Sequence, residues 1–72
     1  MSNNKNIPKI FAEKLKKLRT EKNLSLQQLG KEVGISGVAI GRWERETRVP
    51  TIETLAIFAD YFDVSTDYLL GR

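Results

Sequence analysis

Residues 24–44, with the sequence LSLQQLGKEVGISGVAIGRWE, predict two short helices joined by a tight turn. Ser25 is a favourable N-cap, and Gln28, three residues later, completes a capping box. Gly34 is expected to end the first of these helices, because glycine adopts the left-handed conformation without a steric penalty. Ser36 then caps the second helix. A turn this short sets two helices at a steep angle, which is the helix-turn-helix arrangement.

The second helix has two different faces. Ile40 and Trp43 are spaced to share one face, which predicts that both are buried. The opposite face is small and ends in arginine; its residues are Gly37, Val38, Gly41, Arg42 and Arg45. Glycine in an exposed helix interior costs about 1 kcal/mol relative to alanine, so a purely solvated face would favour other residues. We therefore expect a partner to approach this face closely, and the DNA major groove suits a helix of this kind.

Length and composition limit the class of protein. A chain of 72 residues forms one small domain. The chain has no Cys, so its stability must come from helix packing or from an oligomer partner rather than from disulfides or zinc-thiolate sites. Residues 1–9 lack a signal-peptide pattern, and no apolar run approaches the roughly 20 residues that span a bilayer. A cytoplasmic location is therefore expected.

Charge is distributed unevenly along the chain. Residues 1–48 contain 11 Lys and Arg against 5 Asp and Glu, a net charge of +6, whereas residues 49–72 contain 1 against 4, a net charge of −3. One part of the domain can therefore face a polyanion while the other points away. Small soluble domains also show such asymmetry by chance, so charge by itself leaves both alternatives open.

The segment before the helix-turn-helix is expected to form another helix over Pro8–Lys22. Proline suits the first helical position, and Asn23 is expected to end the helix. Residues 1–7 are expected to form a flexible tail, with a basic arm reaching DNA through Lys5 as the alternative. The helix-turn-helix domain would then span residues 8–72.

Two further helices are expected after the helix-turn-helix. Thr51 caps a fourth helix, whose apolar stripe consists of Ile52, Leu55, Ala56, Ala59 and Phe62. A short last helix covers Thr66–Leu70 and ends at Gly71. The expected single core contains Phe11, Leu15, Leu18, Leu24, Leu29, Val33, Ile35, Ile40, Trp43, Leu55, Ala59, Phe62, Val64, Leu69 and Leu70.

Four large side chains lie off these apolar stripes, namely Ile57, Phe58, Tyr61 and Tyr68. A group of this size on a wet surface would indicate an interface with a partner. The alternative is that so small a domain packs Phe58 into its core.

Taken together, these residues resemble the phage repressor and Cro family of helix-turn-helix regulators. The resemblance covers about residues 10–70. It rests on L-S before the first helix of the helix-turn-helix, V-G-I-S at the turn, and W-E at the end of the helix capped by Ser36, followed by R-x-P-T and V-S-x-x-Y-L-L. It implies a compact, all-α, five-helix lambda-repressor-like domain. It also implies a transcriptional regulator that binds a palindromic operator as a dimer, with the recognition helix Ser36–Glu44 in the major groove.

The resemblance implies individual DNA contacts. Ser36 would hydrogen-bond a phosphate, and Gly37, Val38 and Arg42 occupy base-contacting positions. By residue type, Val38 either meets a thymine methyl group or is a singly exposed apolar residue. Arg42 contacts guanine O6 and N7, contacts a phosphate, or is solvated, and these alternatives remain open. The complete set of expected DNA-binding residues is Arg19, Leu26, Gln27, Ser36, Gly37, Val38, Ala39, Gly41, Arg42, Arg45, Thr47 and Arg48.

Further expected contacts surround the recognition helix. Arg45, Thr47 and Arg48 would meet the DNA backbone after that helix. Arg19 and Glu44 match an inter-helix ion pair that, in the family, orients the arginine toward a phosphate. We expect this pair at a partly exposed site, where it would stabilise the fold by at most about 1 kcal/mol.

The chain departs from the family's pattern at four positions. Leu26, expected to be exposed, stands where the family often has glutamine, and Gly30 replaces the usual alanine. Gly37 has no side chain with which to contact a base. Glu46 stands where glycine commonly ends the recognition helix, and a non-glycine residue is strained in the left-handed conformation.

Other classes of function fit the sequence less well. The chain has no His and no Cys, and no glycine-rich phosphate loop follows a strand. Asp60, Asp63 and Asp67 have no further ligands converging on them. We therefore expect no enzyme activity, cofactor, metal, membrane or small-molecule substrate. The remaining alternative is a protein-interaction module with the same fold, such as an antitoxin or an adaptor.

Overall fold

The computed structural model describes residues 6–46 and 48–72 of the chain. Its five helices are α1 (Ile7–Glu21), α2 (Leu26–Val33), α3 (Gly37–Glu44), α4 (Ile52–Phe62) and α5 (Thr66–Leu69). These two described ranges contain no strand. The expected all-α, five-helix fold with a helix-turn-helix at α2 and α3 is confirmed.

The start of the domain differs slightly from expectation. The predicted tail over residues 1–7 and the predicted arm at Lys5 fall mostly outside the described residues. Asn6 and Ile7, which are described, form the N-cap and the first residue of α1. The helix therefore begins one residue earlier than expected, since the first turn accommodates Pro8 without losing a helical hydrogen bond.

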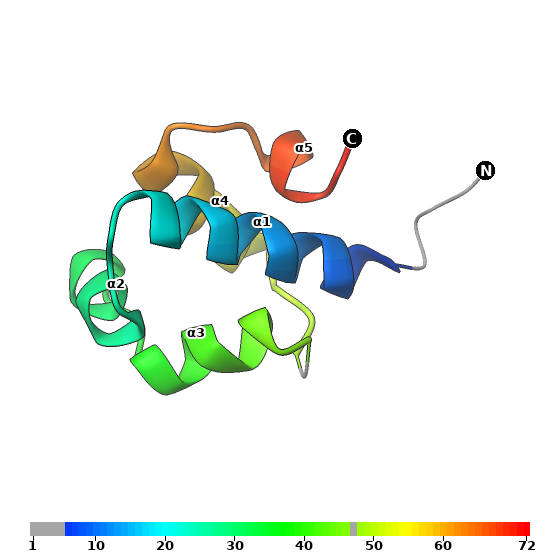
Figure 1. Cartoon of the computed structure of the whole chain (residues 1–72). Helices are drawn as coiled ribbons and strands as arrows, with labels where there is room; N and C mark the ends of the chain where they lie inside the picture. The colour runs from blue at the N-terminus through cyan, green and yellow to red at the C-terminus, as the bar shows by residue number, and fades with distance from the viewer. Residues whose placement is uncertain (1–5, 47) are drawn as a thin grey trace.

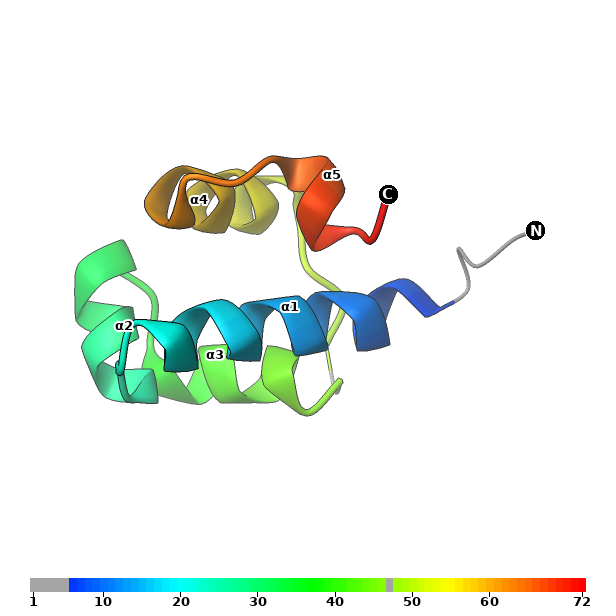
Figure 2. The same cartoon turned by 45° about the horizontal axis from the view of Figure 1, so that its top comes forward.

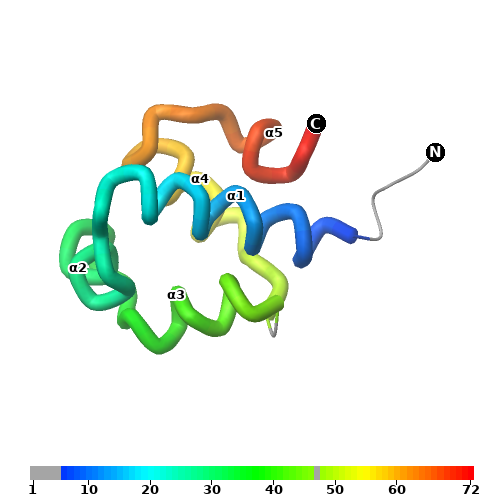
Figure 3. The backbone as a smooth tube through the Cα atoms, in the orientation of Figure 1, coloured from blue at the N-terminus to red at the C-terminus, as the bar shows by residue number. Residues whose placement is uncertain are grey.

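The helices are arranged around α1, which crosses the middle of the molecule (Figure 1). In the turned view of Figure 2, α4 and α5 lie on one side of α1 and α3 lies on the other, while α2 stands at the end of α1. Because α3 contacts both α1 and α2, this helix is held from two directions. The tube in Figure 3 shows the C-terminal end of the chain returning toward α1, where Gly71 packs on Ile10.

Side-chain caps begin four of the five helices. The hydroxyl oxygens of Ser25, Ser36, Thr51 and Ser65 each accept a hydrogen bond from the backbone N–H three residues later, at 2.9 to 3.1 Å. At Ser25 the capping box is complete, because its own N–H donates to Oε1 of Gln28 at 2.8 Å. Each cap satisfies an N–H that the helix itself leaves without a partner. The caps predicted at Ser25, Ser36 and Thr51 are confirmed.

Residues in the left-handed conformation end several helices. Asn23, Gly34 and Gly71 were expected there and have φ values of +58°, +76° and +79°. Glu46 and Asp63 adopt the same conformation, with φ of +65° and +57°. The conformation at Asp63 was not anticipated, although Asp is among the residues that tolerate it best after glycine.

The core contains an aromatic cluster of Phe11, Trp43 and Phe58, whose ring centroids lie 5.9 to 6.5 Å apart. The other fully or nearly fully buried apolar members of the core are Leu15, Leu29, Ile40, Ala59, Phe62 and Leu69. Several expected core residues pack against this centre while partly buried; they are Leu18, Leu24, Val33, Ile35, Leu55 and Val64. The predicted burial of Trp43 is confirmed.

The predicted buried face of α4 is partly wrong. Ile52 and Ala56 were expected in the apolar stripe, yet both are exposed, and Ile52 has 85% of its surface accessible. Phe58 lies off that stripe but is fully buried. The reason is that its ring fills the space beside Phe11 and Trp43, which turns α4 toward the core at Phe58. The alternative in which a small domain buries Phe58 is therefore confirmed.

Candidate nucleic-acid interface

The tight turn between α2 and α3 places glycine at two positions, Gly30 within α2 and Gly34 at its end. The N–H groups of Gly34 and Ile35 both donate to the carbonyl oxygen of Gly30, at 2.8 and 3.1 Å. A Cβ atom on Gly30 would collide with the carbonyl oxygen of Ile35. This close return of the chain explains why glycine replaces the alanine that the family usually has at this position.

The glycines of α3 lie where the first turn of α2 packs on it. A Cβ on Gly37 would lie 3.2 Å from the backbone N of Gln27, and one on Gly41 would lie 3.3 Å from Cδ1 of Leu26. Gly41 is buried, and Gly37 and Leu26 are half-buried. The expectations of an exposed glycine face and of an exposed Leu26 are therefore wrong, because these residues let the two helices approach each other.

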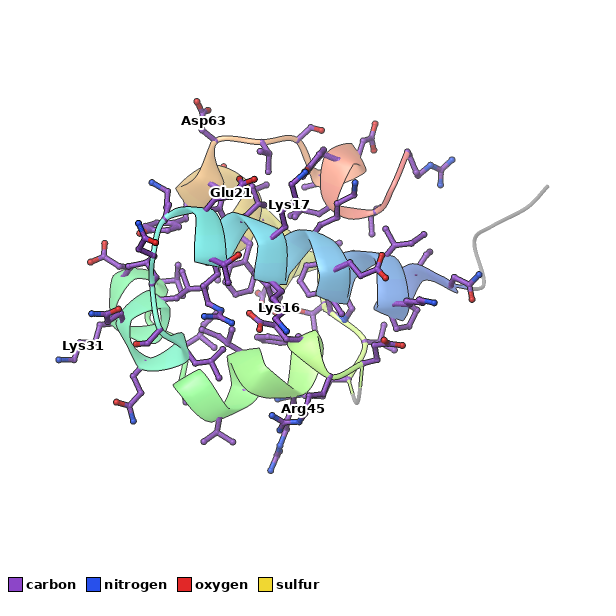
Figure 4. All side chains as sticks on the ribbon, in the orientation of Figure 1. Lys16, Lys17, Glu21, Lys31, Arg45 and Asp63 are labelled. Atoms are coloured by element: carbon purple, nitrogen blue, oxygen red, sulfur yellow. The ribbon has the colours of Figure 1, made fainter. Side chains whose placement is uncertain are left out.

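The exposed side of α3 carries Val38, Arg42 and Arg45, and Gln27 is exposed beside them on α2. We call these four residues the α3 surface. Val38 has 65% of its surface accessible. Figure 4 shows Arg45 on the side of α3 that faces away from α1. A shallow, open groove runs along this surface and is lined by Leu26, Gln27, Gly37, Val38, Gly41 and Arg45.

Ser36 and Ala39, both predicted to contact DNA, also serve the fold. The Oγ of Ser36 accepts a hydrogen bond from the N–H of Ala39 at 3.1 Å. Ala39 is half-buried and packs against the core. Ser36 is exposed, and its hydroxyl keeps its own proton as a donor. Their roles in DNA contact remain predictions.

The segment after α3 places one arginine over the aromatic core. The guanidinium carbon of Arg48 lies 5.2 Å from the centroid of the Trp43 ring, which is a cation–π contact. The rest of Arg48 is exposed. Thr47, the third residue predicted to meet the DNA backbone here, lies outside the described residues.

Arg19 of α1 and Glu44 at the end of α3 form a two-pronged ion pair. The Nε and Nη2 of Arg19 donate to the two carboxylate oxygens at 2.7 and 2.9 Å. The side chains of Arg19 and Glu44 are 13% and 7% exposed and both residues are of intermediate burial, so the expectation of a partly exposed site is confirmed. The hydrogen bond to Glu44 raises the pKa of Arg19 above its already high usual value.

A third hydrogen bond of Arg19 was missed from the sequence. Its Nη1 donates to the carbonyl oxygen of Leu24 at 2.7 Å. Leu24 follows Asn23, whose left-handed conformation turns the chain back toward α1. Arg19 therefore ties α1 to the start of α2 and to the end of α3, and it holds the helix-turn-helix in one orientation.

Within residues 6–46 and 48–72, no group of three or more His, Cys, Asp or Glu is arranged to hold a metal ion. Over the same residues, no helix is long and apolar enough to cross a membrane.

Comparison with known proteins matches residues 15–69 to the helix-turn-helix family HTH_3. The chain belongs to the helix-turn-helix family. It is 36% identical over 62 residues to YobD, an uncharacterized HTH-type transcriptional regulator of Bacillus subtilis strain 168, covering 86% of this chain and 55% of YobD. It is 42% identical over 61 residues to the HTH-type transcriptional activator BcrR of Enterococcus faecalis, covering 85% of this chain and 30% of BcrR.

The helix-turn-helix domain also matches a phage repressor in sequence and structure. It is 36% identical over 61 residues to repressor protein C2 of Salmonella phage P22, covering 85% of this chain and 28% of that protein. The crystal structure of the P22 c2 repressor with a synthetic operator superposes with a TM-score of 0.77 at 37% identity, covering 83% of this chain and 91% of that one. These relatives are transcriptional regulators rather than enzymes. The chain spans between 28% and 55% of the length of the three relatives.

Proposed function

We propose that this chain binds a palindromic operator in duplex DNA as a homodimer and thereby regulates transcription. In this proposal each α3 enters the major groove of one half-site. The observation that carries it is the α3 surface, in which exposed side chains from α2 and α3 form one face beside a shallow groove. The P22 c2 repressor, which shares this fold, was crystallised with operator DNA. A cytoplasmic location, where the DNA of a bacterium or phage is found, belongs to the same proposal.

The DNA contact proposed for each side chain follows from its position on the domain. Gln27, Val38 and Arg42 extend toward base edges, with Val38 suited to a thymine methyl group and Arg42 to guanine. Arg45 and Arg48, which both follow α3, contact phosphates of the DNA backbone. Arg48 is held over Trp43 in the free chain, so its phosphate contact requires only a side-chain movement.

Arg19 is proposed to act mainly by positioning. A guanidinium has five N–H donors, and Arg19 uses three of them on Glu44 and Leu24. The remaining two can donate to a phosphate. The ion pair also fixes α3 before DNA arrives, and such preorganisation lowers the ordering cost of binding.

Selection of bound sites from random duplexes, followed by a mobility-shift series at rising salt, tests the proposal. A regulator should select a palindrome whose half-site centres lie about 34 Å apart, and its affinity should fall steeply with salt as counterions are released. A protein-interaction module with this fold should show neither. No binding to the selected or to generic duplexes at low salt would refute DNA binding.

A further inference from the structure

Gly41 is buried, although the residues one turn before and after it on the same side of α3, Val38 and Arg45, are both exposed. Two side chains cover Gly41. A Cβ atom added to it would lie 3.3 Å from Cδ1 of Leu26, and 3.2 and 3.9 Å from Nη1 and Cζ of Arg45. The side chain of Arg45 therefore runs back along α3 by one turn, and its guanidinium lies against the bare backbone of Gly41.

Arg45 is the freer of the two side chains that cover Gly41. Leu26 is half-buried and packs against the core, whereas Arg45 is exposed and forms the C-cap of α3. With the other described residues, in the ranges 6–46 and 48–72, the guanidinium of Arg45 forms no hydrogen bond or ion pair. Its contact with Gly41 therefore places the guanidinium without using any of its five N–H donors.

The position of this guanidinium matches the surface that is proposed to meet DNA. Arg45 lines the shallow groove along α3 together with Gln27 and Val38, and it lies on the side of α3 that faces away from α1 (Figure 4). Glycine is unfavourable inside a helix, so its presence at position 41 indicates that a side chain there would interfere. A charged group that already lies on the binding surface loses less freedom when DNA binds.

We propose that Gly41 is a positioning residue for DNA binding, which acts by leaving the space in which the guanidinium of Arg45 lies ready for a phosphate. The proposal rests on the proposed operator binding and adds to it a residue that acts through Arg45. A phosphate contact carries no sequence information, so its loss should weaken binding evenly for all sequences. It should also lower the slope of log affinity against log salt by about 0.9 for each bound copy.

The test is a double-mutant cycle of Gly41→Ala and Arg45→Ala, titrated with the selected operator at a series of salt concentrations. Gly41→Ala alone should bind more weakly than the unmodified chain. For each bound copy, the advantage of the unmodified chain should grow about eightfold for every tenfold drop in salt, as expected for one phosphate contact. In the Arg45→Ala background, Gly41→Ala should change neither the affinity nor the salt slope, because no guanidinium is left to displace.

Arg72→Ala provides the matched control background, because it removes the same charge at the exposed end of the chain and should leave the full effect of Gly41→Ala in place. The proposal is wrong if Gly41→Ala binds like the unmodified chain, or if its loss is the same with and without Arg45.

Urea unfolding checks that each variant folds. A Gly41→Ala variant that failed to fold would show that the contact with Leu26 dominates at this position, which would also overturn the proposal. Each of these results leaves operator binding by the unmodified chain intact. If the unmodified chain bound no duplex, the proposed function and the role of Gly41 would fail together.

Discussion

The guanidinium of Arg19 donates to both carboxylate oxygens of Glu44, at 2.7 and 2.9 Å, across 25 positions of sequence. Both side chains are partly buried. Since Glu44 is the last residue of α3 and Arg19 lies in the last turn of α1, the pair sets the orientation of the recognition helix. Its partial burial and two-pronged geometry make it more important to folding than a single, fully exposed surface pair would be.

Glu44→Gln should reduce both stability and DNA affinity. Glutamine keeps one acceptor but loses the charge that balances Arg19, so we expect a stability loss of about 1–2 kcal/mol, within the usual range for hydrogen bonds to charged groups. Operator affinity of the folded protein should also fall, because α3 is held less firmly. Urea unfolding and mobility shifts measure the two effects. Glu13→Gln removes the same charge at an exposed position of α1 and should change neither; an equal loss there would argue against a special role for the pair.

Glu46→Gly should stabilise the chain. Glu46 has φ of +65°, so the expected left-handed conformation is confirmed and the right-handed alternative is excluded. Glycine removes the strain of the Cβ and a carboxylate at the negative end of α3, with an expected net gain of about 0.5–1.5 kcal/mol after the extra freedom of unfolded glycine is subtracted. DNA affinity should rise as well, because a negative charge leaves the proposed phosphate-contacting segment. Denaturant midpoints at equal m-values provide the measurement.

Asn23→Gly is the control for this strain. Asn23 has nearly the same φ, +58°, but asparagine tolerates the left-handed conformation better than glutamate does. Its replacement should therefore stabilise the chain less than Glu46→Gly does. A midpoint for Glu46→Gly below that of the unmodified chain would contradict the strain argument.

Gly30→Ala should destabilise the chain, although alanine is the better helix former. The new Cβ would collide with the backbone carbonyl of Ile35, which cannot move without opening the turn, so we expect a loss of about 1–3 kcal/mol. Gly41→Ala is the matched comparison. Its Cβ would meet only the ends of the flexible Leu26 and Arg45 side chains, at 3.3 and 3.2 Å, so stability should stay within about 1 kcal/mol of the unmodified chain. Thermal melts measure the stability of the two variants. If Gly41→Ala proved less stable than Gly30→Ala, the turn would have to relax around the new Cβ at position 30.

Arg42→Ala separates the guanine and phosphate alternatives for this exposed arginine of α3. If Arg42 contacts guanine, the variant should lose about 1–3 kcal/mol on the selected operator and lose its preference at one base pair in each half-site. If Arg42 contacts a phosphate, the loss should be the same for all sequences. Titration of the operator and of its single-base variants measures this difference. Arg72→Ala, which removes the same charge at the end of the chain, should have little effect on either.

Local sequence alone determined the elements of this fold. The caps at Ser25, Ser36 and Thr51 and the left-handed residues Asn23 and Gly34 were predictable, because each depends on hydrogen bonds or backbone sterics within about four residues. The order of the helices and the helix-turn-helix followed from these signals, and the family followed from the resemblance of motifs such as V-G-I-S and R-x-P-T. The α3 residues Val38, Arg42 and Arg45 were also identifiable as an exposed set from helical periodicity.

Only the tertiary structure decided which faces are covered. Ile52 was predicted to be buried and Phe58 was placed off the core, because periodicity cannot state which side of α4 meets the ring of Trp43. Gly41 and Leu26 were predicted to be exposed for the same reason, since their environment is created by the packing of α2 on α3. The extent to which Arg19 and Glu44 are covered likewise depends on helices that are distant in sequence. Such contacts arise from the whole fold and carry no signal within one helical turn.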